Sequence, residues 1–271
     1  MPKHSTFGKI NASASIAFLI GPFFGGILID SNLYEGLTLS TPFYGISVLF
    51  VLLSGASLLF LREDALAEPV AARSVWQRFN LYKRLSVLFT NQRLKFLLFV
   101  STSFSLAVDI FYQFAPVYLT EKWTLAPSDL IIYNAFLCVS LAVGNGWLAG
   151  YVSRQFDRQK AVIFSTTAVG ALLVGIILAE SPFVMFLLYG SMGIVIGLAV
   201  TLLTVKISDS VSDAIQGEVL GVQIALRVLG EALICLLGGV LLLISPKLVL
   251  GLAAMMTGLA MLYYARRAPA Y

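Results

Sequence analysis

The chain has 271 residues, of which 59% are hydrophobic and only 12% are charged, and its mean hydropathy is +0.90. A soluble domain of this size carries about a quarter charged residues, so the composition argues against a soluble enzyme or a nucleic-acid-binding protein and places most of the chain in lipid. The single histidine, His4, and two cysteines, Cys138 and Cys235, argue against histidine-based catalysis, a disulfide framework or a metal centre, and no cofactor is expected.

Eight apolar runs are each long enough, at about 20 residues, to cross the hydrocarbon core of a bilayer as a helix. The runs are continuously apolar and do not alternate every second residue, so they predict helices and not the strands of a membrane barrel. In chain order the runs are 12–29, 43–61, 96–119, 130–151, 161–179, 183–205, 219–244 and 248–265. The sequence therefore predicts an all-α integral membrane protein with eight transmembrane helices.

The first span contains the sequence Gly21-Pro22-Phe23-Phe24-Gly25-Gly26. Glycines allow helix backbones to approach closely, and a proline removes a backbone donor and can kink a helix near a gate. Ordinary small-residue packing explains the pattern equally well when it is taken alone. The glycine pair recurs as Gly238-Gly239 in the seventh span, which indicates a parallel internal repeat of the first two spans in the last two.

The connection 62–95 between the second and third spans is long and basic. Its aromatic residues and leucines recur at three- and four-residue steps beside lysines and arginines, which is typical of a helix lying on the membrane surface. We favour a linker between two helix bundles over a dedicated lipid sensor. Because almost all of the 18 Lys and Arg residues lie on this side of the predicted membrane, both termini are predicted to be cytoplasmic.

The third span carries a carboxylate, Asp109, with Ser101, Ser105, Tyr112 and Gln113 on the same face at helical spacing. An ionised group at the centre of a membrane helix costs about 2.5 to 3.5 kcal/mol and usually faces a cavity or a partner. Partial desolvation favours the protonated carboxyl group, so Asp109 is the candidate proton-exchanging group. A structural carboxylate that forms hydrogen bonds across helices is the alternative.

In the seventh span, Gln223, Arg227 and Glu231 follow one another at four-residue steps, so their side chains stack on one face of the helix. Arg227 and Glu231 could form an ion pair, which would lower the free energy needed to insert both charges. A structural role and a role in switching remain equally open, because a buried pair is weak evidence for stability.

A short basic connection follows the fourth span, with Gly150, Arg154, Arg158 and Lys160 in the sequence Gly150-Tyr-Val-Ser-Arg-Gln-Phe-Asp-Arg-Gln-Lys160. This connection resembles the second-half copy of the basic loop motif of the major facilitator superfamily, although Phe156 and Asp157 stand where that motif has a glycine. Gly21, Pro22, Gly25 and Gly26 resemble the end of the antiporter motif in the fifth helix of the same family, with Ala17 in place of an upstream glycine.

The layout of two spans, a long basic loop and six further spans completes the resemblance, which covers helices five to twelve of a drug–proton antiporter of the tetracycline-exporter kind. The resemblance implies three parts: residues 1–61 as the last two helices of the amino-terminal bundle, 62–95 as the central cytoplasmic loop, and 96–271 as the complete six-helix carboxy-terminal bundle. It also implies export of a small molecule or drug, coupled to protons, by alternating access in the bacterial inner membrane.

In this interpretation Asp109, Gln113, Arg227 and Glu231 line the proton and substrate pathway. The partners are the small-molecule substrate, protons and the lipid bilayer; the substrate itself and the oligomeric state stay open. Relative to the family, four helices are missing at the start, so we expect a truncated chain that does not transport alone. The alternatives are a non-transporting remnant, a partner that supplies helices to another membrane protein, and a complete eight-helix protein of another family.

Overall fold

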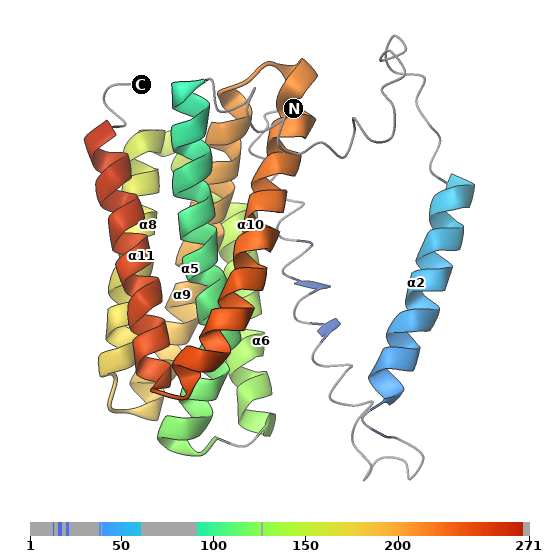
Figure 1. The fold of residues 1–271 in the computed structure, drawn as a ribbon, viewed down its shortest axis with the longest axis vertical. Coiled ribbons are helices and arrows are strands. Elements are labelled where there is room, and N and C mark those ends of the chain that lie inside the picture. Colours follow the sequence, from blue (N-terminus) through green and yellow to red (C-terminus); the bar gives the residue numbers. More distant parts are fainter. Residues whose placement is uncertain are drawn as a thin grey trace. The chain divides into compact units, whose positions relative to one another are not determined.

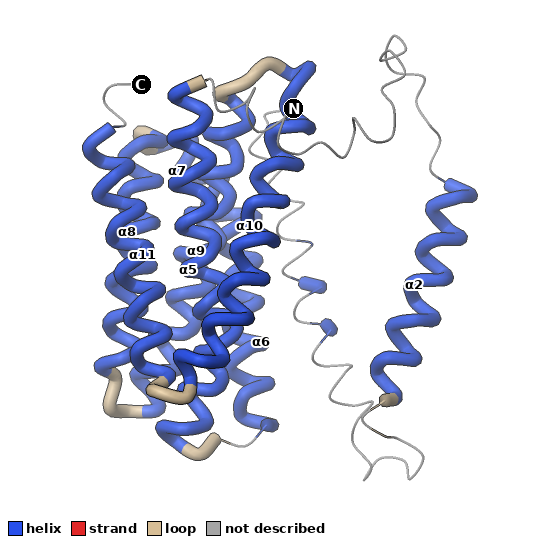
Figure 2. Tube along the Cα trace, viewed as in Figure 1, coloured by secondary structure: helices blue, strands red, loops and turns tan. Residues whose placement is uncertain are grey.

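A computed structural model of the chain describes residues 40–60, 91–125 and 127–267, together with positions 13, 16, 17, 20, 21 and 38. Most of the predicted span 12–29 and of the connection 62–95 lies outside these residues. The chain forms two compact units, one of Ile20–Arg84 and one of Met1–Leu19 with Leu85–Tyr271. In the part of the chain that the structure describes, every regular element is a helix, and short connections join successive helices of the larger unit (Figure 2).

The smaller unit contributes the helix α2 (Thr41–Phe60), which covers the predicted span 43–61. None of its 20 residues is buried. Its sequence is apolar along its whole length, as a membrane-spanning helix requires.

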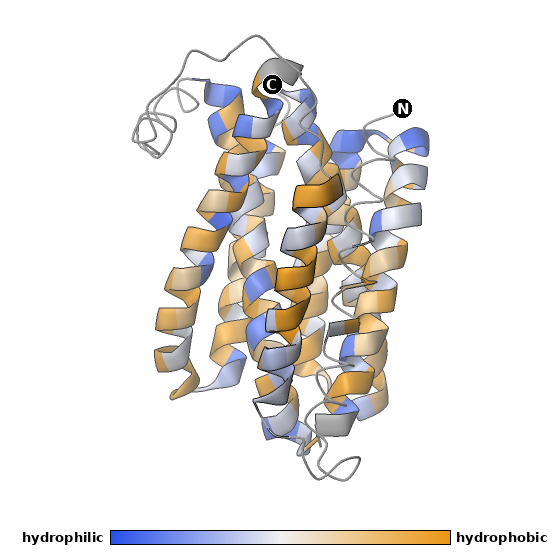
Figure 3. Cartoon of the chain, turned by 90° about the vertical axis from the view of Figure 1, so that its right-hand side faces the viewer, coloured by the Kyte–Doolittle hydropathy of each residue, from blue (hydrophilic) through white to orange (hydrophobic). Residues whose placement is uncertain are grey.

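The larger unit is a bundle of long helices (Figure 1). Its elements in chain order are α5 (Gln92–Trp123), α6 (Pro127–Val143), the π-helical turn η1 (Gly144–Leu148), α7 (Ala149–Gln155), α8 (Arg158–Leu178), α9 (Pro182–Asp209), α10 (Asp213–Leu242) and α11 (Pro246–Arg267). The elements α6, η1 and α7 follow one another without a break and make up the predicted span 130–151. Hydrophobic residues occupy most of the length of the helices (Figure 3).

Seven helices within the described residues are long and apolar enough to cross a membrane, counting α6, η1 and α7 as one. They correspond to the second through eighth predicted spans, and the all-α fold class is confirmed. The first predicted span, 12–29, lies outside the described residues apart from isolated positions.

Capping residues and prolines set where the helices begin. The Asn91 side chain accepts hydrogen bonds from the backbone N–H groups of Arg93 and Leu94 at 3.0 and 3.2 Å, so α5 begins at Gln92, four residues before the predicted span. Asp157 caps α8 in the same way, with 2.7 Å to the N–H of Gln159. Pro182 and Pro246 are the first residues of α9 and α11. A backbone N–H at this position has no partner within the helix, so proline, which lacks the N–H, loses no hydrogen bond there.

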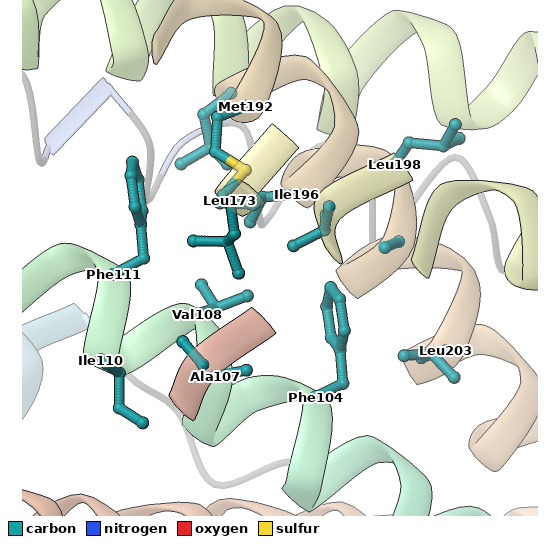
Figure 4. Packing of buried hydrophobic residues seen from close by; sticks show 14 of the residues in the cluster. Phe104, Ala107, Val108, Ile110, Phe111, Leu173, Met192, Ile196, Leu198 and Leu203 are labelled. Carbon is teal, nitrogen blue, oxygen red and sulfur yellow. The ribbon is translucent and has the colours of Figure 1, made fainter. Parts of the chain in front are cut away.

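Helices α5 and α9 supply most of the core of the bundle. Phe104, Val108 and Phe111 of α5 lie close to Leu173 of α8 and Ile196 of α9 in this core (Figure 4). These side chains are at most 4% exposed. Helix α5 also packs against α10 and α11, so a residue on its α10-facing side lies between two membrane-spanning segments.

Helices α6 and α9 approach so closely that only glycine fits between them. A Cβ atom on Gly197 would lie 2.6 Å from the carbonyl oxygen of Leu141, and one on Gly193 would collide with that of Leu137. Gly144, the first residue of η1, faces the backbone of Ile194 in the same way. The glycines of α9 therefore act in helix packing, as expected where membrane helices lack a hydrophobic driving force between them.

Candidate functional site

Asp109 and Arg227 form an ion pair between α5 and α10. The Arg227 Nε donates to Asp109 Oδ2 at 2.9 Å, and its Nη2 donates to Asp109 Oδ1 at 2.6 Å. This two-pronged geometry matches the planar guanidinium to both carboxylate oxygens and is among the strongest side-chain interactions in proteins. Asp109 lies 17 positions after Gln92 along the 32-residue α5, so the pair lies near the middle of that helix.

Further polar contacts lie on either side of this ion pair along the same two helices. Gln223 of α10 donates through Nε2 to Ser101 Oγ of α5 at 2.6 Å. In the other direction, Gln113 of α5 donates through Nε2 to Glu231 Oε1 of α10 at 3.5 Å, and its Oε1 accepts from Cys235 Sγ at 3.4 Å. We call this set the polar ladder; its members are Ser101, Asp109, Gln113, Gln223, Arg227, Glu231 and Cys235.

The polar ladder follows from four-residue spacing on both helices. Gln223, Arg227, Glu231 and Cys235 are each one helical turn apart, and Asp109 and Gln113 are likewise one turn apart on α5. Since residues at i and i+4 share a helix face, two such faces that meet bring their polar groups together in register.

The two partners of the ion pair differ in exposure. The Asp109 side chain is 3% exposed, whereas that of Arg227 is 45% exposed. Asp109 therefore depends on Arg227 for its charge compensation, while Arg227 keeps a route to groups outside the bundle of described helices. Glu231 lies one turn from Arg227 on the same helix and offers a second carboxylate to the same guanidinium.

This arrangement can exchange partners. If Asp109 were protonated, Glu231 would be the remaining carboxylate close to the guanidinium of Arg227. The Asp109 side chain is 3% exposed, so an anion from solution could not take its place. The two hydrogen bonds at 2.6 and 2.9 Å are the charged contact between α5 and α10. The pair therefore links a titratable carboxylate of α5 to a cation of α10.

The predicted pathway residues are thus brought together, with one difference in pairing. Their spacing allows an ion pair between Arg227 and Glu231 within one helix, but the structure pairs Arg227 with Asp109 of α5. The packing of α10 against α5 explains this pairing, because it brings the carboxylate of Asp109 to 2.6 Å from the guanidinium of Arg227. Tyr112, also predicted on the Asp109 face, packs its ring 5.8 Å from that of Phe111.

A buried hydrogen bond between η1 and α9 was not predicted from the sequence. Thr201 Oγ1 donates to Asn145 Oδ1 at 2.9 Å, and the residues are 0% and 4% exposed. Asn145 lies inside the π-helical turn, and such turns occur often at functional sites. A polar amide in an apolar run between Gly144 and Gly146 is the signal that could have found it.

The residues of the basic loop motif lie at one end of the bundle. Gly150 and Arg154 belong to α7, and Arg158 and Lys160 to the first turn of α8. Arg158 Nη1 donates to Asp209 Oδ2 at the end of α9 at 3.0 Å, and the two side chains are 53% and 36% exposed.

The antiporter motif falls mostly outside the described residues. Gly21 is helical, and a Cβ atom there would meet nothing within 4 Å. Pro22, Gly25 and Gly26 lie outside the described residues. Among the residues that the structure describes, no group of three or more His, Cys, Asp or Glu side chains could hold a metal ion.

Comparison with known proteins identifies the family. The family model described as Major Facilitator Superfamily matches residues 4–234. The chain is also 25% identical over 246 residues to a protein of Bacillus subtilis (strain 168) described as "Uncharacterized MFS-type transporter YuxJ", a match that covers 89% of this chain. The chain spans about 60% of the length of that curated relative.

The family match covers well over half of the chain, and the seven apolar helices agree with it. The alternative of an unrelated eight-helix membrane protein is thereby excluded, and a membrane enzyme with it. The chain is an integral membrane protein that belongs to the Major Facilitator Superfamily, a family of transporters and not of enzymes.

Proposed function

We propose that this chain forms part of a proton-coupled secondary transporter that exports a small molecule or drug by alternating access. It works in the bacterial inner membrane, with both termini in the cytoplasm, as the concentration of Lys and Arg at one end of the spans favours. Transport is assigned to the whole transporter, of which this chain contains at least the six-helix bundle that starts with α5.

The observation that carries the proposal is the ion pair between Asp109 and Arg227. Ionisable residues in the middle of membrane-spanning helices are rare and mark ion and substrate pathways. Here a carboxylate that is 3% exposed is held by one guanidinium, and a second carboxylate, Glu231, lies one turn away. Asp109 supplies the proton acceptor. Glu231 supplies another partner for Arg227 when Asp109 is protonated and loses its charge.

The coupling step is an exchange of partners. Protonation of Asp109 removes the charge that holds Arg227 against α5, and the guanidinium turns to Glu231 on its own helix. Helices α5 and α10 then separate at this level, while Gln223 and Ser101 remain in contact nearer one end. Release of the proton restores the pair, so each cycle moves one proton through a site that also changes the spacing of two helices.

Asp109→Asn tests the proposal. In proteoliposomes we expect the variant to lose uptake driven by a pH gradient, because an amide at this position cannot release a proton. Exchange of labelled for unlabelled substrate without a gradient should persist, since it needs the transport path but no net proton movement. Lipophilic cations and tetracycline-like drugs form the substrate panel, in a version of the chain extended by four amino-terminal helices.

Glu180→Gln is the matched control, because Glu180 is a carboxylate in the exposed connection between α8 and α9. It should keep both activities. Gradient-driven uptake by Asp109→Asn at the wild-type rate would remove the proton role from Asp109, and loss of exchange as well would make Asp109 a structural residue.

A further inference from the structure

A groove opens between the start of α5 and the end of α11, away from the polar ladder. Its volume is about 490 Å³, within the range of small-molecule sites. The described residues that line it are Gln92, Lys95, Phe96, Phe99, Leu259, Ala260 and Tyr263. Helices α5 and α11 pack against each other, and two of the lining residues, Phe96 and Ala260, are buried in the bundle.

The groove is polar at one end and apolar at the other. Gln92 and Lys95 lie in the first turn of α5, at the end of the predicted membrane span, whereas Phe99 lies one turn deeper, about 6 Å along the helix axis. Phe99 and Leu259 are 58% and 59% exposed, so the apolar wall faces the hydrocarbon and not the protein interior. This is the polarity profile of a phospholipid, with its headgroup at the interface and its chains below.

Aromatic rings shape the apolar wall. The ring centroid of Tyr263 lies 5.2 Å from that of Phe96 and 5.5 Å from that of Phe99, in tilted and edge-on arrangements. Phe96 also stacks on Tyr264 at 5.7 Å. Interlocked rings lose little conformational freedom when a flexible acyl chain lies against them, so the wall is organised before the ligand arrives.

The charge at this end favours an anion. Lys95 lines the groove, and none of its described lining residues is acidic. Arg93 in the first turn of α5 and Arg266 in the last turn of α11 add positive charge at the same end. Basic groups between membrane helices at the cytoplasmic side are a recurring site for anionic lipid headgroups.

We propose that the α5–α11 groove binds an anionic phospholipid, with the ammonium group of Lys95 at the phosphate and an acyl chain against Phe99, Leu259 and Tyr263. The lipid lies along the seam between the two helices and adds contacts to both. This site is independent of the polar ladder and of proton coupling, because it shares no residue with them.

Native mass spectrometry of the delipidated chain, titrated with phosphatidylglycerol or with phosphatidylcholine of the same acyl chains, tests the proposal. Phosphatidylglycerol should bind more tightly, and Lys95→Ala should weaken it about fivefold, the effect of one cation near a membrane surface, without changing phosphatidylcholine binding. Lys95→Arg should retain wild-type affinity, and Phe99→Ala should weaken both lipids.

Lys160→Ala is the control, since it removes an exposed cation at the same end of the bundle, in the first turn of α8. It should change phosphatidylglycerol affinity less than twofold. Equal effects of Lys95→Ala and Lys160→Ala on phosphatidylglycerol binding, or unchanged phosphatidylglycerol binding in Lys95→Ala, would overturn the proposal. Displacement of the lipid by millimolar inorganic phosphate would also overturn the proposal, because it would show that the groove binds a free anion and does not need the acyl chain.

Discussion

Asp109 is a charged side chain in the middle of a membrane-spanning helix, and its stability there depends on one partner. Removing one member of a buried ion pair leaves an uncompensated charge and costs roughly 3 to 5 kcal/mol. Because the side chain of Arg227 is 45% exposed, water can replace part of the lost interaction on the arginine side, but the 3% exposed side chain of Asp109 has no such access. The two single substitutions should therefore be unequal.

We expect Arg227→Ala to destabilise the protein by about 3 kcal/mol, at the low end of that range. Asp109→Asn should destabilise it less, because an amide is neutral and still accepts a hydrogen bond from the guanidinium. The double variant should be more stable than Arg227→Ala alone, since no buried carboxylate remains unpaired. Unfolding of the wild type, the two single variants and the double variant in mixed detergent micelles forms a double-mutant cycle. The cycle measures the coupling free energy between the two residues, and strictly additive changes in the free energy of unfolding would contradict the ion pair.

At the scale of the elements, the apolar runs predicted the described helices because lipid demands about 20 apolar residues of each. The ends were less predictable: Asn91 and Asp157 cap α5 and α8 several residues before the apolar sequence begins. For the site, four-residue spacing placed Arg227 and Glu231 on one face. It could not say which helix faces them, because that choice depends on how α5 and α10 pack.

The π-helical turn η1 was beyond prediction for a similar reason. Its first residue, Gly144, lies where the backbone of α9 leaves no room for a side chain, and Asn145 is held by Thr201 from the same helix. The contact between α6 and α9 therefore sets the local geometry of η1, and the polar Asn145 between two glycines marks the position without specifying an extra residue per turn.

The close approach of α6 and α9 leads to a prediction for Gly197. In Gly197→Ala the new methyl group would lie 2.6 Å from the Leu141 carbonyl oxygen and 2.8 Å from the backbone nitrogen of Asn145, and neither backbone atom can yield without moving a helix. We expect a loss of about 1 to 3 kcal/mol, as for other overpacked cores. Thermal unfolding in detergent, followed by size-exclusion chromatography of heated samples, measures it.

Gly258→Ala in α11 serves as its control. A Cβ atom there would meet nothing within 4 Å, and alanine has the higher helix propensity, so this variant should unfold at or above the wild-type temperature. If Gly197→Ala were as stable as Gly258→Ala, glycine would not be needed where α6 and α9 cross.

At the scale of the whole molecule, the charge distribution predicts the orientation in the membrane. The connection between α7 and α8, with Arg154, Arg158 and Lys160 around it, should be cytoplasmic, and the connection with Glu180 should face the other side. Alkaline phosphatase fused after Glu180 should therefore be active in a bacterial host and the same enzyme fused after Asp157 inactive. The reverse pattern would invert the assigned orientation.

The polar ladder and the proposed α5–α11 groove share no residue, so the two proposals can be tested separately. Substitutions in the α5–α11 groove should alter lipid affinity without altering the proton dependence of transport, and Asp109→Asn should do the opposite. The family match assigns the chain to a superfamily of transporters, and the ion pair between α5 and α10 is the place in this chain where we propose that a proton acts.

The most direct test is substrate-stimulated proton flux in proteoliposomes that contain a pH-sensitive dye. The 271-residue chain and a version extended by four amino-terminal helices are each measured as wild type and as Asp109→Asn, over lipophilic cations and tetracycline-like drugs. We predict substrate-dependent flux in the extended wild type and none in its Asp109→Asn variant. Equal flux in the two, or no flux with any substrate in either wild-type form, would contradict proton coupling through Asp109.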